Sequence, residues 1–312
     1  MPVVLGRNSF INIGEEVTWG SPVATPVSNR IVSTTMQRSQ ERNQTTFLST
    51  GSAAFSQGFF DGMELTGGTI DLPIYYEGSG MLLKAAIGSA ASTPGPAPYT
   101  HTYTPSADLP SLTIDVMRGS STVEKFEGCI VSSMTMSVEA GGEMTASFDI
   151  VAQTAAARSG TVSSSFGDGR QVLHYEAGQL NFNAVNYSLR SMELTVDNKI
   201  DRRNLLGSKL TAQPLVTDIR EVTLTVTLDL EDNNLYDAQL AGTQGTPDIT
   251  FTNSDSDQLR IRLYNAVITE YDDALNTVGR IERTLTFQGL SDAVNPAFDI
   301  VIANQDASAI GN

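Results

Sequence analysis

The stretch FEGCIVSSMTMSVEAGGEMTASFDIVAQ, from Phe126 to Gln153, alternates along most of its length between two faces of an extended chain. Before the Gly141-Gly142 pair, one face would carry Ile130, Ser132, Met134, Met136 and Val138. After the pair, Met144, Ala146, Phe148 and Ile150 alternate with polar residues. Period-two alternation is typical of strands with one buried face, and a glycine pair suits a tight turn. The stretch therefore predicts a β-hairpin.

Three segments recur in the same order, which predicts an internal duplication. The matched pairs, with their offsets in residues, are Ile31–Ser49 and Leu189–Gly207 (158), Glu64–Gly88 and Asp218–Gly242 (154), and Phe126–Gln153 and Leu263–Leu290 (137). The middle pair aligns without a gap, and all three pairs keep the phase of their alternation. Each copy should therefore contain a strand, a long loop, a second strand, a short helix, a further strand and a hairpin.

The short helix in each copy has recognisable ends. Gly78-Ser79 and Asp232-Asn233 are suitable N-cap positions. Gly88 and Gly242 fit the C-terminal cap. Because so little of the sequence favours helix, the pattern predicts a mainly β fold. We expect two tandem β-sandwich or barrel domains, each flanked by one short α-helix.

The boundary between the copies is predicted in the small, polar segment Thr154–Arg170. We expect a first domain over residues 1–156, a linker over 157–170 and a second domain over 171–312. Copy one also carries a Pro-rich insert, Ser89–Ser111, where copy two has only Thr243–Pro247. Its composition predicts a surface loop.

Charge and cysteine content narrow the class of protein. The 312 residues carry a net charge of −16, which disfavours binding to nucleic acid or to anionic membranes. This acidity fits either simple solubility or a surface that DNA must pass without sticking. One cysteine excludes an intrachain disulfide. The N-terminus lacks the pattern of a signal peptide, and no apolar run approaches the ~18 residues of a membrane span.

Candidate chemistry is sparse. Cys129 would need a histidine partner to act as a nucleophile, and neither His101 nor His174 lies in a recognisable motif. Alternation marks the methionines of the hairpin as core filling rather than metal ligands. The acidic cluster at Asp229–Asp232 lacks the spacing of a calcium loop. We expect no enzyme, no cofactor and no metal site.

Two stretches carry a family resemblance. GEEVTWGSPVA (Gly14–Ala24) resembles the start of the tail tube proteins of long, flexible-tailed bacteriophages. YTHTYTPSADLPSLTIDV (Tyr99–Val116), followed by Phe126–Gln153, resembles the middle of the same proteins. The resemblance covers about half of the chain, mainly copy one, and copy two shows little of it.

This resemblance implies a structural virion protein that polymerises as stacked rings into the tail tube, the conduit for DNA ejection. Some members of the family fuse two tube domains, so that three chains make a pseudo-hexameric ring, and the duplication matches that variant. Implied partners are other copies of the chain, the tape measure, tail terminator and distal tail proteins, and genomic DNA that passes through the lumen without specific binding. The expected location is the virion tail, after assembly in the host cytoplasm. The alternative is a β-sandwich binding module on a virion or cell surface.

Two groups of residues are candidates for assembly and for the lumen. The long loops, Gln44–Asp61 and Asp201–Asp218, should contact neighbouring chains or rings because their apolar side chains would otherwise stay in water. The inter-subunit candidates are Phe47, Leu48, Phe55, Phe59, Phe60, Arg202 and Arg203. Glu193 and Asp197 are candidate lumen acids, although alternation alone does not show which face of a strand points inward.

Overall fold

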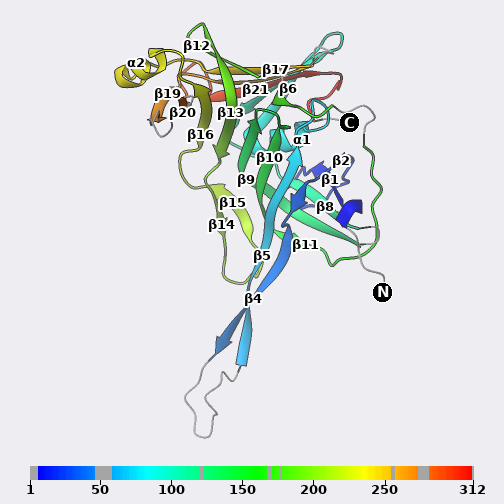
Figure 1. Ribbon diagram of the computed structural model, residues 1–312. Coiled ribbons are helices and arrows are strands. Elements are labelled where there is room, and N and C mark those ends of the chain that lie inside the picture. Colours follow the sequence, from blue (N-terminus) through cyan, green and yellow to red (C-terminus); the bar gives the residue numbers. More distant parts are fainter. Residues whose placement is uncertain are drawn as a thin grey trace.

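The computed structural model describes residues 6–45, 58–119, 122–166, 171–175, 178–253, 257–272 and 281–310. Strands dominate this part of the chain (Figure 1), and two short α-helices accompany them, α1 (Gly80–Ile87) and α2 (Asn234–Ala241). The mainly β fold with short helices is therefore confirmed.

A central antiparallel sheet crosses the middle of the chain. In the described residues its long strands follow the spatial order β4, β5, β10, β9, β13, β16, β20 and β19. Their bounds are β4 (Gln37–Thr45), β5 (Gly58–Pro73), β9 (Thr122–Glu139), β10 (Thr145–Ala152), β13 (Val185–Asp197), β16 (Glu221–Asp229), β19 (Val267–Asp272) and β20 (Glu282–Gln288). The short β3 (Ser33–Thr34) lies beside β5 at the β4 edge. The first four strands come from the first half of the chain, and the last four come from the second.

A second antiparallel sheet packs over the same core, in the order β6, β7, β21, β18, β17 and β12. Its strands are β6 (Gly88–Thr93), β7 (Tyr99–Pro105), β12 (Gln179–Phe182), β17 (Asp248–Thr252), β18 (Gln258–Leu263) and β21 (Phe298–Asn304). This sheet also joins the two halves, because Tyr103 of β7 lies opposite Ile300 of β21.

The remaining described elements lie mainly around the first half. β2 (Val27–Asn29), β1 (Phe10–Glu15) and β8 (Leu112–Arg118) extend from the first part of β9, and β11 (Thr154–Ala155) also pairs with β9. A 3-10 turn, η1 (Gly6–Asn8), precedes β1. A separate small hairpin joins β14 (Ile200–Arg203) to β15 (Ala212–Val216).

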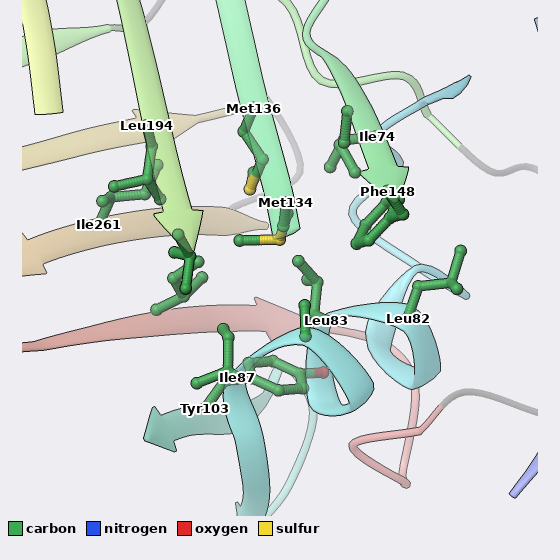
Figure 2. Close-up of a cluster of buried hydrophobic side chains, with 14 of the residues drawn as sticks. Ile74, Leu82, Leu83, Ile87, Tyr103, Met134, Met136, Phe148, Leu194 and Ile261 are labelled. Atoms are coloured by element: carbon green, nitrogen blue, oxygen red, sulfur yellow. The ribbon is translucent and has the colours of Figure 1, made fainter. Parts of the chain in front are cut away.

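Helix α1 lies inside the core. Every residue of the helix except Lys84 is buried, as expected for a helix that is apolar on all sides. Figure 2 shows Leu82 and Leu83 pointing toward the central-sheet residues Phe148 and Met134. Met134, Met136 and Met144 are each fully buried, which confirms that the hairpin methionines fill the core.

Helix α2 occupies the corresponding place in the second half, yet it is far more exposed. Of its residues only Leu235 is buried. Tyr236 stacks on Tyr271 of β19 with ring centroids 5.4 Å apart. The predicted helix ends are confirmed, because Ser79 and Asn233 are the N-caps and Gly88 and Gly242 are the C-caps.

The Pro-rich insert is not the surface loop that its composition predicts. Its first part is strand β6, its middle is strand β7, and the two form a hairpin at the edge of the second sheet. His101 and Tyr103 of β7 are buried. The alternation in YTHTYTP predicts this strand, but the prolines and glycine around it outweighed the pattern.

The described part of the predicted linker runs along the first half instead of hanging free. The amide of Ser159 donates to the carbonyl of Val123 at 3.1 Å. The side-chain amide of Asn12 donates to the carbonyl of Ser163 at 2.9 Å. Since the two halves also share both sheets, the boundaries at residues 156 and 171 stay a prediction.

Candidate functional site

The seam between the two halves is the pairing of β9 with β13. Ser133 lies opposite Asp197, and Glu139 lies opposite Ser191 at the other end of the register. The fully buried Asn198 fastens one end of this seam. Its amide N–H donates to the carbonyl of Ser132 at 2.9 Å. Its side-chain Nδ2 donates to the carbonyls of Ala86 and Val131 at 2.8 and 3.0 Å.

One face of the central sheet points away from the core, and we call it the polar face. Along its strands, buried apolar residues alternate with partly exposed polar ones. Its hydroxyl-bearing residues include Ser133, Thr135, Ser137, Thr145, Ser147, Thr223, Thr225, Thr227, Thr284 and Thr286. Its carboxylates include Asp71, Glu139, Asp149, Glu193, Asp197, Glu221, Asp229 and Glu282. Both candidate lumen acids, Glu193 and Asp197, therefore lie on this face.

Cations that reach the described polar face are held by its acids. Lys199 Nζ lies 2.7 Å from Asp197 and 2.9 Å from Glu221. Burial acts to raise the pKa of Asp197, but the hydrogen bonds and charge of Lys199 outweigh it and leave that pKa below its ordinary value. Arg190 lies in the same way 3.4 Å from Asp229 and 2.5 Å from Glu282. The face is therefore net negative in its described part.

The two ends of the central sheet are edges. Among the described strands, β19 has β20 as its neighbour, and β3 and β4 have β5. By contrast, β9 and β13 each have a neighbour on both sides, because they meet at the seam. An open edge presents backbone donors and acceptors that can pair with another chain.

The predicted loop of copy one is largely a hairpin. β4 continues through Thr45 and β5 begins at Gly58, so the two strands form an arm that extends well beyond the body (Figure 1). Phe59 and Phe60 lie on this arm and are 62% and 57% exposed. Phe47, Leu48 and Phe55 lie outside the described residues.

The loop of copy two is the β14–β15 hairpin, which lies beside the base of the arm (Figure 1). Arg202 Nη2 donates to the carbonyl of Thr66 on β5 at 2.8 Å, so this candidate residue contacts its own chain. Arg203 is exposed. The sequence did not single out Asn198 or Lys209, because their partners are distant in the chain.

Enzyme chemistry finds little support in the described residues. Burial raises the pKa of the Cys129 thiol well above its ordinary value, which makes it a poor nucleophile. No group of three or more His, Cys, Asp or Glu side chains among these residues is placed to hold a metal ion. The helices described here are all too short or too polar to span a membrane.

The sequence model of the phage tail tube protein family matches residues 6–289. The chain belongs to this family. It is therefore a structural protein of the virion tail, and the first of the two function classes holds. The search of curated proteins gave no match.

Within this tail tube protein, two of the family-like stretches lock together through Glu16. The buried Glu16 carboxylate accepts hydrogen bonds from the amides of Gly20 and Gly128 and the hydroxyls of Ser111 and Thr113, at 2.8 to 2.9 Å. Gly128 has φ +63°, and a Cβ there would come within 3.1 Å of the Trp19 ring. The glycine is required because Trp19 and the strand pack so closely.

Proposed function

We propose that three chains close into a ring of six similar halves, and that these rings stack into the tail tube through which DNA leaves the capsid. The observation that supports this most directly is the seam. Two halves with the same strand order already lie side by side in one sheet within a single chain. A further copy placed by the same rule would extend that sheet until it closes.

The proposed duplication, with halves 1–156 and 171–312 and a connection over 157–170, is supported by matching irregularities. In the β9–β10 hairpin the register shifts at Ser132, and in the β19–β20 hairpin it shifts at Thr269, 137 residues later. Ser132 Oγ donates to the carbonyl of Asp149, and Thr269 Oγ1 donates to the carbonyl of Thr286, both at 3.1 Å. The acceptors are also 137 residues apart.

The sheet registers refine one of the three offsets. Gln37 lies opposite Gly67, and Thr195, 158 residues after Gln37, lies opposite Thr223. This places β16 156 residues after β5, whereas the helices keep the offset of 154. The second copy is thus two residues shorter between strand and helix. A slip of two residues leaves every side chain on the same face, which is why the ungapped alignment kept its phase.

The same comparison supports a register for ring closure. Asp197 faces Ser133 at the internal seam. The equivalent residues at the two open edges are Ser39 and Glu270, at offsets of 158 and 137. We therefore expect Ser39 of one chain to face Glu270 of the next. Gln40 is the counterpart of Asn198, and its side-chain amide could donate to a carbonyl at the Thr269 bulge of that next chain.

Cysteine cross-linking tests this ring. The double variant S39C/E270C should form disulfides between chains under mild oxidation, because residues that face each other across strands are close enough to bridge. The largest covalent product on a non-reducing gel should be a trimer. The matched control S39C/D272C displaces one cysteine by two residues and should cross-link poorly. Products beyond a trimer, or equal cross-linking of both variants, would contradict a three-chain ring in this register.

In this assembly we place the polar face toward the lumen, with the helices outside. The acids and hydroxyls of the polar face suit a wall along which DNA slides, because a basic wall would bind phosphates through counterion release. Helix α1 lies on the opposite, core side of the sheet (Figure 2). An electrostatic map of an assembled tube would test this placement, and a neutral or positive lumen would contradict it.

We assign contact between successive rings to the arm. Phe59 and Phe60 are more than half exposed in the single chain, and a neighbouring ring would bury them. An arm that reaches beyond the body (Figure 1) is suited to bridge the gap between rings.

A further inference from the structure

The arm has a weak point near its base. The register between β4 and β5 shifts between Gln40 and Arg42, so Glu41 is an extra residue on β4. It lies beside Gly62, where an added Cβ would come within 2.9 Å of the Glu41 side chain. A β-bulge bends a hairpin and interrupts its hydrogen-bond ladder. A two-stranded ribbon has little stability of its own, so the arm would swing at this bulge unless something supports it.

The β14–β15 hairpin and the segment that joins its strands contact the arm on both sides of this bulge. On the outer side, Lys209 Nζ lies 2.8 Å from the Asp61 carboxylate. On the inner side, the amide of Glu64 donates to the carbonyl of Lys209 at 2.8 Å. Nearer the body, Arg202 Nη2 donates to the carbonyl of Thr66 at 2.8 Å.

The supporting hairpin is itself well fixed. Arg202 Nη1 also donates to Thr211 Oγ1 at 3.2 Å, and Thr211 is buried. Burial lowers the pKa of Arg202, as expected for a guanidinium that is partly withdrawn from water. At the start of the hairpin, Asn198 is fastened to the seam through its contacts with Ala86 and Val131.

We infer that the β14–β15 hairpin is a brace that holds the arm at a fixed angle to the body. The two long loops of the chain then have different tasks, although they occupy corresponding places in the two halves. The loop of copy one reaches the next ring, and the loop of copy two supports it. Each ring would present three arms to its neighbour, one per chain. This last step rests on the proposed ring of three chains, whereas the brace itself is a property of the single chain.

Hydrogen exchange of the unassembled protein tests the brace directly. K209E replaces the attraction to Asp61 with repulsion, and an exposed ion pair of this kind corresponds to about two- to fivefold in local opening. We expect the amides of residues 61–66 to exchange faster by about that factor. R202Q should give a larger increase, about tenfold, because it removes a charge-assisted hydrogen bond. The control R203E makes the same charge change as the first variant on the same hairpin and should leave these amides unaffected.

A charge swap adds specificity. The double variant D61K/K209E restores an ion pair in reversed order and should return the exchange of residues 61–66 toward that of the unaltered protein. If K209E and R202Q exchange like the unaltered protein, or if the charge swap gives no rescue, the brace is refuted.

Electron microscopy of the same variants separates the brace from the proposed function. K209E should still form rings, since the seam and sheet edges are unchanged, but should give fewer or shorter tubes, and D61K/K209E should recover them. Normal tubes from K209E would contradict the assembly role of the brace. If the unaltered protein forms neither rings nor tubes, the proposed function fails, and the exchange experiment still decides whether the hairpin restrains the arm.

Discussion

Ser132 and Thr269 perform the same task in two hairpins that lie on opposite sides of the seam. Each is the extra residue of a bulge, and each hydroxyl donates to a carbonyl on the partner strand at 3.1 Å. At the seam, the carbonyl of Ser132 accepts the amide of Asn198 at 2.9 Å. The bulge of the first hairpin is therefore part of a joint between halves, and the bulge of the second lies on an edge strand, where our ring places the next chain.

The buried carboxylate of Glu16 should be critical for folding. In E16Q the side-chain nitrogen cannot accept a hydrogen bond, so donors that now point at the carboxylate would lose their partner. We expect a loss of about 2–4 kcal/mol in the free energy of unfolding, measured by denaturant titration. The control E15Q removes a carboxylate that pairs with Lys84 at 2.7 Å in a partly exposed setting and should cost less than about 1 kcal/mol. Equal losses in both variants would refute this role of Glu16.

The exposed aromatic residues of the arm should matter for polymerisation and little for the single chain. Replacing Phe59 and Phe60 with Ser should block tube formation while the unfolding temperature changes little, because both side chains are more than half exposed. Electron microscopy and thermal unfolding measure the two effects. F148S is a useful contrast, since Phe148 is fully buried and its loss should unfold the protein. Normal tubes from the Phe59 and Phe60 variant would remove the arm from the ring-to-ring contact.

Reversal of charge on the polar face should make the tube bind DNA. The variant E139K/E193K introduces cations at two exposed positions of that face. We expect its tubes to retain a single-stranded oligonucleotide in sedimentation, and the bound fraction should fall steeply between about 50 and 200 mM salt. D108K, at an exposed position in the loop after β7, is a single-charge control. If the double variant binds no more DNA than D108K does, the polar face does not line the lumen.

Asp292 should make stability depend on pH in the acid range. Hydrogen bonds from the amides of Asn295 and Val294, and from the Asn265 side chain, lower the pKa of Asp292 to about 2. Because the folded pKa is below the unfolded value of 3.8, the contribution of the carboxylate is present above pH ~4 and is lost as the pH falls toward ~2. The difference in unfolding temperature between the unaltered protein and D292A should therefore be largest near neutral pH and shrink over that window. A difference that is constant with pH would refute this origin.

The sequence predicts the strands well because alternation is a local property. Met134 and Met136 mark one face of β9 wherever the strand lies, and the glycine pair after it marks the turn. The helix ends at Gly88 and Gly242 are equally local, since a glycine accommodates the positive φ of 126° and 61° found there. The β6–β7 hairpin shows the limit of composition, because its buried residues His101 and Tyr103 follow the same alternation between prolines.

What the sequence does not provide is the identity of partners that lie far apart in the chain. Arg202 and Lys209 look like solvated loop charges until the β14–β15 hairpin is placed beside β5, which is more than a hundred residues earlier. Likewise, Glu193 lies on an unlabelled face of its strand until Met192 and Leu194 are seen to be buried in the core. Alternation determines that there are two faces and which residues share each of them. Only the packing of helix α1 and the second sheet against one face decides which is core and which is the polar face, because that choice depends on contacts between distant segments.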